Sequence, residues 1–340
     1  MHYTVKKNLP KSGENFYAFR MRIVFLDAGT VDLGDVDVSS LRRLGSYRAF
    51  ADTLPSRIVS RARGADIVVT NKCVLGAREI NALPRLALIA VAATGVNNVD
   101  LVAARRRRVA VTNVAGYSTT TVAEHALLFL LSFSHRLREH HEAALSHWSR
   151  SGKFALLDHP YADLFGKTLG VVGYGAIGRR VARLAGAFGM KVMIAKLPGR
   201  RYPSAPKRFA LRDVLRTADF VTLHCPLTEA TRHLINKATL RRMKPGAFLL
   251  NLSRGAVVSE KDVAAALALV GGRLAGYATD VLSREPPPEN HPLFARRIRD
   301  KVLMTPHVAW ASRESRQRLV DEIARNIRAF QNGRRRNRIV

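Results

Sequence analysis

The stretch Thr168-Leu-Gly-Val-Val-Gly173-Tyr-Gly175-Ala-Ile-Gly178-Arg-Arg-Val181 decides the fold class. A short apolar run leads directly into the spacing G-x-G-x-x-G and then into helix-forming sequence, which predicts a strand, a tight turn and a helix. Gly173 would permit the turn, Gly175 would let the backbone approach a pyrophosphate, and Gly178 would let the helix pack close to the strand. The helix amino terminus would attract the phosphate charge. We therefore predict a dinucleotide-binding unit rather than a plain glycine turn.

Length and composition allow two domains, since 340 residues with 47% apolar content can build two separate cores. No apolar stretch approaches the length needed to cross a bilayer, so we expect a soluble protein without a membrane partner. The two cysteines, Cys73 and Cys225, lie far apart in the chain and without His/Cys ligand spacing. We therefore expect no disulfide framework, no metal site and a cytoplasmic location.

The formal net charge of +30 raises the question of a nucleic-acid partner. Part of this charge is concentrated in residues 1–20, in Arg105–Arg108 and in residues 334–338, and the remainder is scattered. Scattered arginines are usually solvated, and no basic module interleaved with aromatic residues accompanies them. We expect any affinity for nucleic acid to be incidental.

Apolar runs alternate with helical patterns along the chain, which is typical of parallel sheets covered by helices. Residues 1–20 show little periodicity and are predicted to be a disordered leader. A long helix over residues 120–140 is predicted to leave the first sheet, and a last helix over 312–332 is predicted to return to it. Strands are predicted at 23–26, 67–70, 86–92 and 109–112 in the first unit, and after the glycine motif at 191–195, 220–223, 247–251, 276–280 and 302–304 in the second.

Three polar residues follow predicted strand ends in the second unit: Arg254, Glu285 and His307. Open parallel sheets hold ligands at the carboxyl ends of their strands. A guanidinium can grip the carboxylate of a 2-oxo acid, and an imidazolium can donate a proton to its ketone. An adjacent carboxylate favours the charged imidazole. We therefore predict that these three residues are the catalytic set of a nicotinamide-dependent hydride transfer, with Arg254 and His307 also contacting the substrate.

Several ordered motifs carry a resemblance to a known family. The motifs Asp163-Leu-Phe-Gly-Lys-Thr-Leu-Gly170, His224-Cys-Pro-Leu-Thr228 and Thr305-Pro-His-Val-Ala-Trp-Ala-Ser312 resemble the D-isomer-specific 2-hydroxyacid dehydrogenases. They are most similar to the glycerate dehydrogenase/hydroxypyruvate reductase branch, and the resemblance extends from about Met21 to Val340.

This resemblance implies an α/β fold of two Rossmann-like, doubly wound domains. A flavodoxin-like, discontinuous substrate domain would comprise residues 21–118 and 312–340, and an inserted dinucleotide-binding domain would comprise residues 119–311. The active cleft would lie between the two domains. The family commonly forms a homodimer through its nucleotide domains, so a homodimer is expected.

The resemblance also implies roles for individual residues. Arg254, Glu285 and His307 match the catalytic residues of the family in their order along the chain. Gly95 and Val96 belong to a segment that resembles the loop whose backbone amides hold the substrate carboxylate. Lys72 would help to draw in acidic substrates, with a merely solvated lysine as an equal alternative, and Trp310 would limit the substrate side chain. Cofactor contacts are implied for the glycine turn and for later strand ends: Gly173, Gly175, Ala176, Ile177, Gly178, Cys225, Pro226, Thr231, Ser253 and Asp280, with Asp280 near the nicotinamide amide.

One position departs from the family pattern in a way that concerns the cofactor. Members that prefer NAD place an acid at the end of the second nucleotide-domain strand, whereas this chain has Lys196 there, followed by Arg200 and Arg201. An acid would repel a 2′-phosphate, while these cations could pair with it. NADP is therefore as open as NAD, although the general arginine excess of the chain could also place basic residues here.

The predicted function is reduction of a small 2-oxo acid, hydroxypyruvate or glyoxylate first, to the D-2-hydroxy acid with NAD(P)H. One alternative keeps the fold and changes the substrate to a bulkier 2-oxo acid. The other is a dinucleotide-sensing, corepressor-like binding protein whose basic surface engages nucleic acid or an acidic partner.

Overall fold

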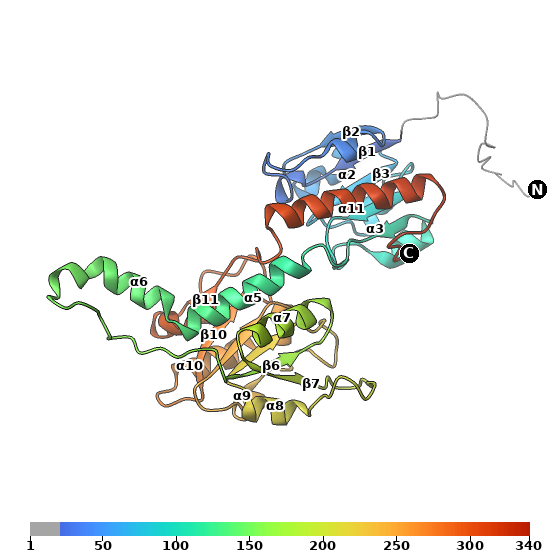
Figure 1. Cartoon of the computed structure of the whole chain (residues 1–340). Coiled ribbons are helices and arrows are strands. Elements are labelled where there is room, and N and C mark those ends of the chain that lie inside the picture. The colour runs from blue at the N-terminus through green and yellow to red at the C-terminus, as the bar shows by residue number, and fades with distance from the viewer. Residues whose placement is uncertain (1–20) are drawn as a thin grey trace, which may run out of the picture. The chain divides into compact units, whose positions relative to one another are not determined.

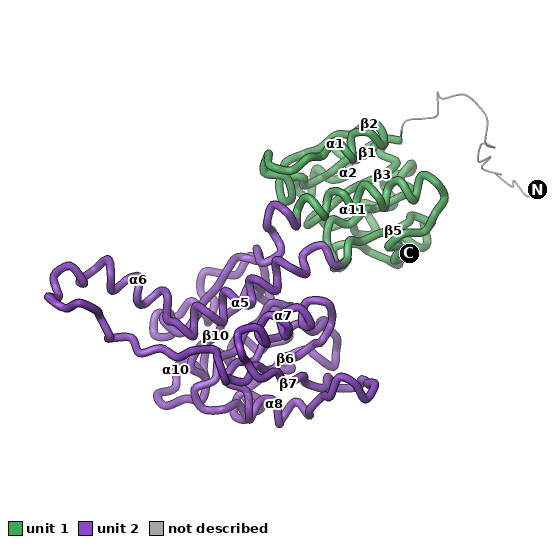
Figure 2. Tube along the Cα trace, in the orientation of Figure 1, with its two compact units in different colours: residues 1–115, 316–340 green, residues 116–315 purple. Residues whose placement is uncertain are grey.

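The computed structural model describes residues 21–340, which divide into two compact units (Figure 2). Unit 1 holds the described residues up to Ala115 together with Arg316–Val340, and unit 2 is the continuous segment Gly116–Ser315. These limits lie within a few residues of the predicted domain limits. The predicted leader, residues 1–20, lies outside the described residues.

Unit 1 is built on a parallel sheet with the strand order β2-β1-β3-β4-β5. This order is the flavodoxin-like one. The strands β3 and β4 are buried along their whole length, which explains their continuous apolar sequences. The strands are β1 Arg22–Phe25, β2 Ser46–Ala49, β3 Ile67–Thr70, β4 Leu88–Val91 and β5 Ala110–Thr112. The helices are α1 Ser39–Arg42, α2 Ile58–Arg61, α3 Ala77–Asn81, α4 Leu101–Arg106 and α11 Arg313–Gln331, with short 3-10 turns η1 Ala28–Thr30 and η2 Pro55–Arg57.

The last helix, α11, is fixed to unit 1 by an ion pair between a buried arginine and a half-buried aspartate. Arg316 is 5% exposed, and its guanidinium donates to both carboxylate oxygens of Asp35 at 2.6 Å. The hydrogen bond from Arg316 lowers the pKa of Asp35 to about 2. The carboxyl-terminal part of the chain thereby completes a unit that begins at β1.

Unit 2 contains a parallel sheet of six strands in the order β11-β10-β9-β8-β6-β7. A parallel bridge joins Ala195, the last residue of β7, to Phe209 beyond it. In a doubly wound dinucleotide-binding sheet, a third strand pairs with the second one at the sheet edge, and this single bridge lies in its place. With that substitution the strand order of unit 2 matches the order of the dinucleotide-binding sheet. The strands are β6 Thr168–Val172, β7 Lys191–Ala195, β8 Phe220–Leu223, β9 Ala247–Asn251, β10 Leu274–Thr279 and β11 Val302–Met304.

Both faces of this sheet are covered. On β6, Leu169 and Val171 pack with α5 and α7 in one apolar cluster, while Val172 belongs to the cluster on the other face. Figure 1 shows α5 and α7 side by side, and these two helices are in contact. The helices are α5 Thr119–Ser134, α6 Leu137–Ser146, α7 Ala176–Ala187, α8 Leu211–Thr217, α9 Lys237–Leu240 and α10 Glu260–Ala268, with 3-10 turns η3 Trp148–Arg150, η4 Gly255–Val257, η5 Pro292–Phe294 and η6 Arg296–Lys301.

The predicted single helix over residues 120–140 is wrong. The structure has two helices there, because Arg136 adopts a left-handed backbone conformation with φ 49° between α5 and α6. No glycine or proline marks this break. In the part of the chain that the structure describes, no helix combines the length and the apolar character needed to cross a membrane.

Candidate active site

The three glycines of the first βα turn of unit 2 have different surroundings. Gly173 has φ +99°, and a Cβ on it would lie 2.5 Å from the backbone nitrogen of Cys225. A Cβ on Gly178, in the first turn of α7, would lie 2.0 Å from the carbonyl oxygen of Gly173. A Cβ on Gly175 would meet no atom within 4 Å, so the backbone here faces open space at the start of α7. Ala176 and Ile177 form the first turn of this helix beside it.

This turn fits a dinucleotide. Open space in front of Gly175 and the amino terminus of a twelve-residue helix provide the approach and the positive dipole end that a pyrophosphate requires. The ring of His224, whose backbone closes over Gly173, has a buried Nδ1 without a hydrogen-bond partner among the described residues. Burial lowers the pKa of His224 to about 4, so the ring is neutral at physiological pH.

The residues after β8 shape one wall of this region. Cys225 is buried, and burial raises the pKa of its thiol to about 11. The hydroxyl of Thr231 donates to the carbonyl oxygen of Pro226 at 2.6 Å and accepts from the backbone nitrogen of Thr228 at 2.8 Å. Thr231 therefore holds the loop in shape, in addition to the cofactor contact predicted for it.

The end of β7 carries an exposed cationic group. Lys196, Arg200 and Arg201 are all exposed, and no carboxylate of the described chain lies within ion-pair distance of them. The hydroxyl of Tyr202 accepts a hydrogen bond from the backbone nitrogen of Leu197 at 3.1 Å, which pins the loop to the strand end. The three cations thus follow the strand end at which the predicted ribose site would lie.

Arg254 lies on a turn that Asn251 organises at the end of β9. The side chain of Asn251 accepts from the backbone and hydroxyl of Ser253 at 3.1 and 2.8 Å, and donates to the carbonyl oxygen of Arg254 at 3.0 Å. Asn251 and Ser253 are buried, whereas Arg254 is exposed. The guanidinium lies against this turn, since Nη1 of Arg254 donates to the carbonyl oxygen of Ser253 at 2.7 Å.

Glu285 and His307 form a close pair. Glu285 Oε2 lies 2.6 Å from His307 Nδ1, and its other oxygen accepts from the backbone nitrogen of Leu282 at 2.8 Å. Both side chains are about one-third exposed, 37% for Glu285 and 29% for His307. With Nδ1 facing the carboxylate, Nε2 of His307 is the atom left to meet a substrate.

Asp280, at the end of β10, holds the turn that carries His307. Its buried carboxylate accepts from the hydroxyl of Thr305 at 2.6 Å and from the backbone nitrogens of Val308 and Ala309 at 2.8 and 3.0 Å. His307 itself has φ 56°, a conformation that costs a non-glycine residue about 1–3 kcal/mol. The predicted contact of Asp280 with the nicotinamide stays a prediction, and its role in bracing this turn was not foreseen.

Two aromatic residues, Trp310 and Tyr117, contact each other near His307 and Arg254. The indole nitrogen of Trp310 donates to the carbonyl oxygen of His307 at 2.9 Å, and its ring meets that of Tyr117 edge-on at 6.1 Å. Tyr117 is near enough to Arg254 to interact with its charge, while burial raises the pKa of the phenol to about 12. His125 Nε2, on α5, lies 3.1 Å from Thr305 Oγ1.

The predicted substrate loop residues lie in unit 1. Lys72 is exposed, and it follows β3 in a segment whose consecutive backbone nitrogens, from Asn71 to Cys73, donate to the buried carboxylate of Asp27. Gly95 and Val96 lie in the loop after β4, and the segment is held by the hydrogen bond from the backbone nitrogen of Val114 to Ala93 at 3.0 Å. Hydrogen bonds within unit 1 therefore fix the backbone of both segments.

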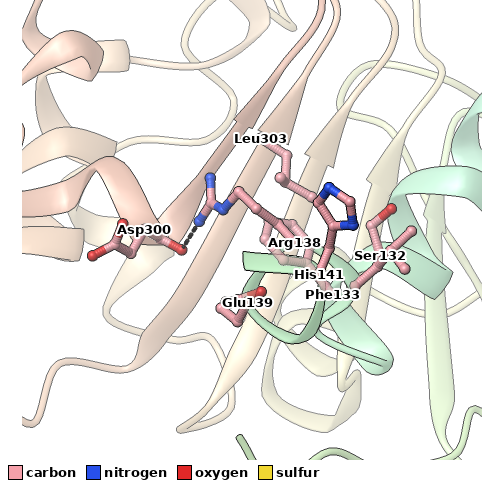
Figure 3. Close-up of a pocket in the computed structure, with 8 residues that line it drawn as sticks. Ser132, Phe133, Arg138, Glu139, His141, Asp300 and Leu303 are labelled. Atoms are coloured by element: carbon pink, nitrogen blue, oxygen red, sulfur yellow. Dashed lines mark hydrogen bonds between the residues drawn. The ribbon is translucent and has the colours of Figure 1, made fainter. Parts of the chain in front are cut away.

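A cavity of about 320 Å³ occurs elsewhere in unit 2 (Figure 3). Its wall includes Arg138, whose guanidinium donates to the carbonyl oxygens of Asp300 and Val302 at 2.6 and 3.3 Å. None of the predicted site residues lines it. No group of three potential metal-binding side chains occurs within residues 21–340.

Comparison with known proteins identifies the family. Residues 127–309 match the model of the D-isomer specific 2-hydroxyacid dehydrogenase NAD binding domain. A glycerate dehydrogenase of Methylorubrum extorquens is 35% identical over 93% of this chain and 98% of its own. A hydroxypyruvate reductase of Blautia hydrogenotrophica is 33% identical over 92% and 98%. The crystal structure of the TT0316 protein from Thermus thermophilus superimposes with a TM-score of 0.83, 33% identity and coverage of 94% and 100%. The chain belongs to the D-isomer specific 2-hydroxyacid dehydrogenase family.

Proposed function

We propose that the protein reduces small 2-oxo acids, with hydroxypyruvate and glyoxylate as the first candidates, to their D-2-hydroxy acids. The observation that carries this proposal is the 2.6 Å pair of Glu285 and His307 in the same unit as the glycine turn. The names of the two relatives, glycerate dehydrogenase and hydroxypyruvate reductase, support the choice of substrate.

In this proposal the bound nicotinamide supplies a hydride to the substrate carbonyl carbon. Arg254 binds the substrate carboxylate through its planar set of donors and orients the ketone. His307 holds a proton on Nε2 and donates it to the carbonyl oxygen as negative charge develops there. Glu285 accepts from Nδ1 of His307, which fixes the orientation of the ring and keeps Nε2 toward the substrate. Trp310 and Tyr117 would limit the substrate side chain.

We further propose that NADPH is used at least as well as NADH. Lys196, Arg200 and Arg201 are exposed at the end of β7, where NAD-selective relatives carry an acid by the resemblance described above. A 2′-phosphate would gain charge-assisted hydrogen bonds from these cations. Arg200→Ala combined with Arg201→Ala should weaken NADPH binding about ten-fold and leave NADH binding within two-fold. Arg216→Ala on α8, also an exposed arginine, is the matched control.

A homodimer is also part of the proposal. The segment between α6 and β6, residues 147–167, exposes large apolar side chains, among them Phe154 and Leu157 at 99% and 83% exposure. Exposed apolar groups in one segment are typical of a protein interface. We expect the second copy to cover them. A cytoplasmic location is consistent with the two buried free thiols, Cys73 and Cys225.

The decisive assay follows loss of reduced-nicotinamide absorbance with hydroxypyruvate, glyoxylate and phenylpyruvate, with NADH and NADPH measured in parallel. Rapid turnover of the two small oxo acids supports the proposal, and Arg254→Ala should remove most of it. Turnover of phenylpyruvate alone would move the assignment to a bulkier substrate. Dinucleotide binding without any turnover would favour the sensing protein.

A further inference from the structure

A buried polar cluster that the proposed reaction does not use lies beneath the loop that carries Glu285. Glu260, in the first turn of α10, is 8% exposed, and His291 is 6% exposed. Glu260 Oε1 accepts from the backbone nitrogen of Ser283 at 2.7 Å. Its other oxygen accepts from the Ser283 hydroxyl at 2.6 Å and lies 3.0 Å from His291 Nε2.

The hydrogen bonds of His291 define its proton position. Its Nδ1 accepts from the backbone nitrogen of Leu293 at 3.3 Å, so this nitrogen carries no proton. The proton therefore resides on Nε2 and is donated to Glu260. The carboxylate thus receives three donors, two from Ser283 and one from His291, and joins both ends of the segment 283–291.

Glu285 lies within this segment and is held by the amide next to the one that Glu260 holds. The backbone nitrogen of Leu282 donates to Glu285 at 2.8 Å, and that of Ser283 donates to Glu260 at 2.7 Å. The same turn packs on the Arg254 side of the site, since a Cβ on Gly255 would lie 1.9 Å from the carbonyl carbon of Leu282. A shift of Ser283 would therefore move the Glu285 carboxylate relative to His307.

We propose that Glu260 is a positioning residue for the reaction, which acts through Ser283 and His291 to hold the Glu285 loop at hydrogen-bond distance from His307. A buried carboxylate is costly unless its donors are in place, so the cluster favours one conformation of the loop. This inference rests on the proposed reductase function for its kinetic part and on contacts within unit 2 for its structural part.

Glu260→Gln is the test, because it keeps the volume of the side chain and removes one acceptor oxygen. The substituted amide nitrogen would face a donor, which should loosen the loop. We expect kcat to fall about ten- to hundred-fold, with binding of the reduced nucleotide within two-fold of wild type. Ser283→Ala removes a single hydrogen bond and should lower kcat in the same way, but only a few-fold. This milder variant keeps the proposal testable if Glu260→Gln fails to fold.

Asp262→Asn is the matched control. Asp262 lies in the same first turn of α10, but its carboxylate accepts from the backbone nitrogen of Lys237 at 2.9 Å. It has no contact with the Glu285 loop among the hydrogen bonds of the described chain. The same change from carboxylate to amide should therefore leave kcat unchanged.

A double-mutant cycle separates positioning from general damage. If Glu260 acts through Glu285, Glu260→Gln should lower kcat much less in a Glu285→Gln background than in wild type, since both changes affect one interaction. A kcat that falls only in proportion to the folded fraction, or losses that add fully in the double variant, would overturn the proposal.

Hydrogen exchange of the peptide covering residues 281–291 gives a readout that does not depend on turnover. Faster exchange in Glu260→Gln than in Asp262→Asn supports the positioning contact, and equal exchange overturns it. Should wild type lack turnover with every oxo acid, the proposed function would fail, and this exchange comparison would still decide the structural inference.

Discussion

Replacing Gly178 by alanine tests the glycine turn against a matched position in the same helix. An ideal Cβ on Gly178 would lie 2.0 Å from the Gly173 carbonyl oxygen and 3.3 Å from a methyl carbon of Val171. An ideal Cβ on Gly186, also in α7, would meet no heavy atom within 4 Å. Both substitutions gain about 1 kcal/mol of helix propensity. The steric conflict is therefore the difference between the two variants.

The size of the conflict follows from the geometry. Ordinary contact begins near 3.4 Å, so α7 must move from the Gly173 turn by roughly 1.4 Å, the difference between 3.4 and 2.0 Å. Overpacking of this kind typically costs about 1–3 kcal/mol. We expect Gly178→Ala to be less stable than Gly186→Ala by about that amount, or about 2–4 °C in Tm per kcal/mol for a unit of this size.

Nucleotide affinity should separate the variants more strongly than stability. Because Gly178 sets the distance between α7 and the turn, its substitution should raise the Kd for NADH at least ten-fold, about 1.4 kcal/mol. Gly186→Ala should leave this Kd unchanged. Fluorescence titration and thermal unfolding measure the two quantities on the same samples. A Gly178→Ala protein with wild-type Kd and a Tm equal to that of Gly186→Ala would refute the assignment of the turn.

Three further predictions concern the catalytic pair, acid stability and assembly. Glu285→Gln should lower kcat at least ten-fold, because His307 loses the carboxylate that fixes the orientation of its ring. An unchanged kcat would contradict this role. Since burial lowers the pKa of His224 to about 4, the unfolded state takes up this proton first as the pH falls. The free energy of unfolding should therefore decline as the pH falls from about 6.5 to 4. Thermal unfolding of a His224→Gln variant should show a weaker decline of Tm over this range. An equal decline of Tm in the variant and in wild type would show that His224 does not contribute. The double substitution Phe154→Ser and Leu157→Ser should shift the mass measured by light scattering from dimer to monomer, whereas the control Val270→Ser, fully exposed outside this segment, should not; a wild-type monomer would refute the interface.

The central strands and the glycine turn were predictable because their sequence signals are local. The strands β3 and β4 are continuous apolar runs, and Gly173, Gly175 and Gly178 show the spacing that the turn requires. The edge strand β2 was missed, since its sequence Ser-Tyr-Arg-Ala lacks both an apolar run and a buried face. Strands at the edge of a sheet are often short and carry charged or polar side chains, which weakens their sequence signal.

The features that sequence reasoning missed depend on tertiary hydrogen bonds. The break at Arg136 carries no glycine or proline, so the backbone reversal is set by packing. Glu260 and His291 lie outside strand ends, and their link through Ser283 joins segments that are separate in the sequence. A glutamate in a helical first turn is usually a solvated group that favours the helix dipole, which gave no reason to consider Glu260.

The discontinuity of unit 1 has a consequence for how the protein is made on the ribosome. Residues 116–315 emerge as an uninterrupted segment, so the nucleotide-binding unit can fold before synthesis ends. Unit 1 can complete its fold only later, because its edge strand β5 is covered by a distant segment. The backbone nitrogen of Ile339 in that segment donates to the carbonyl oxygen of Val111 at 2.8 Å. Until then β5 presents an open strand edge to other nascent chains. A segment translated more than 200 residues after β5 thus protects this strand from aggregation.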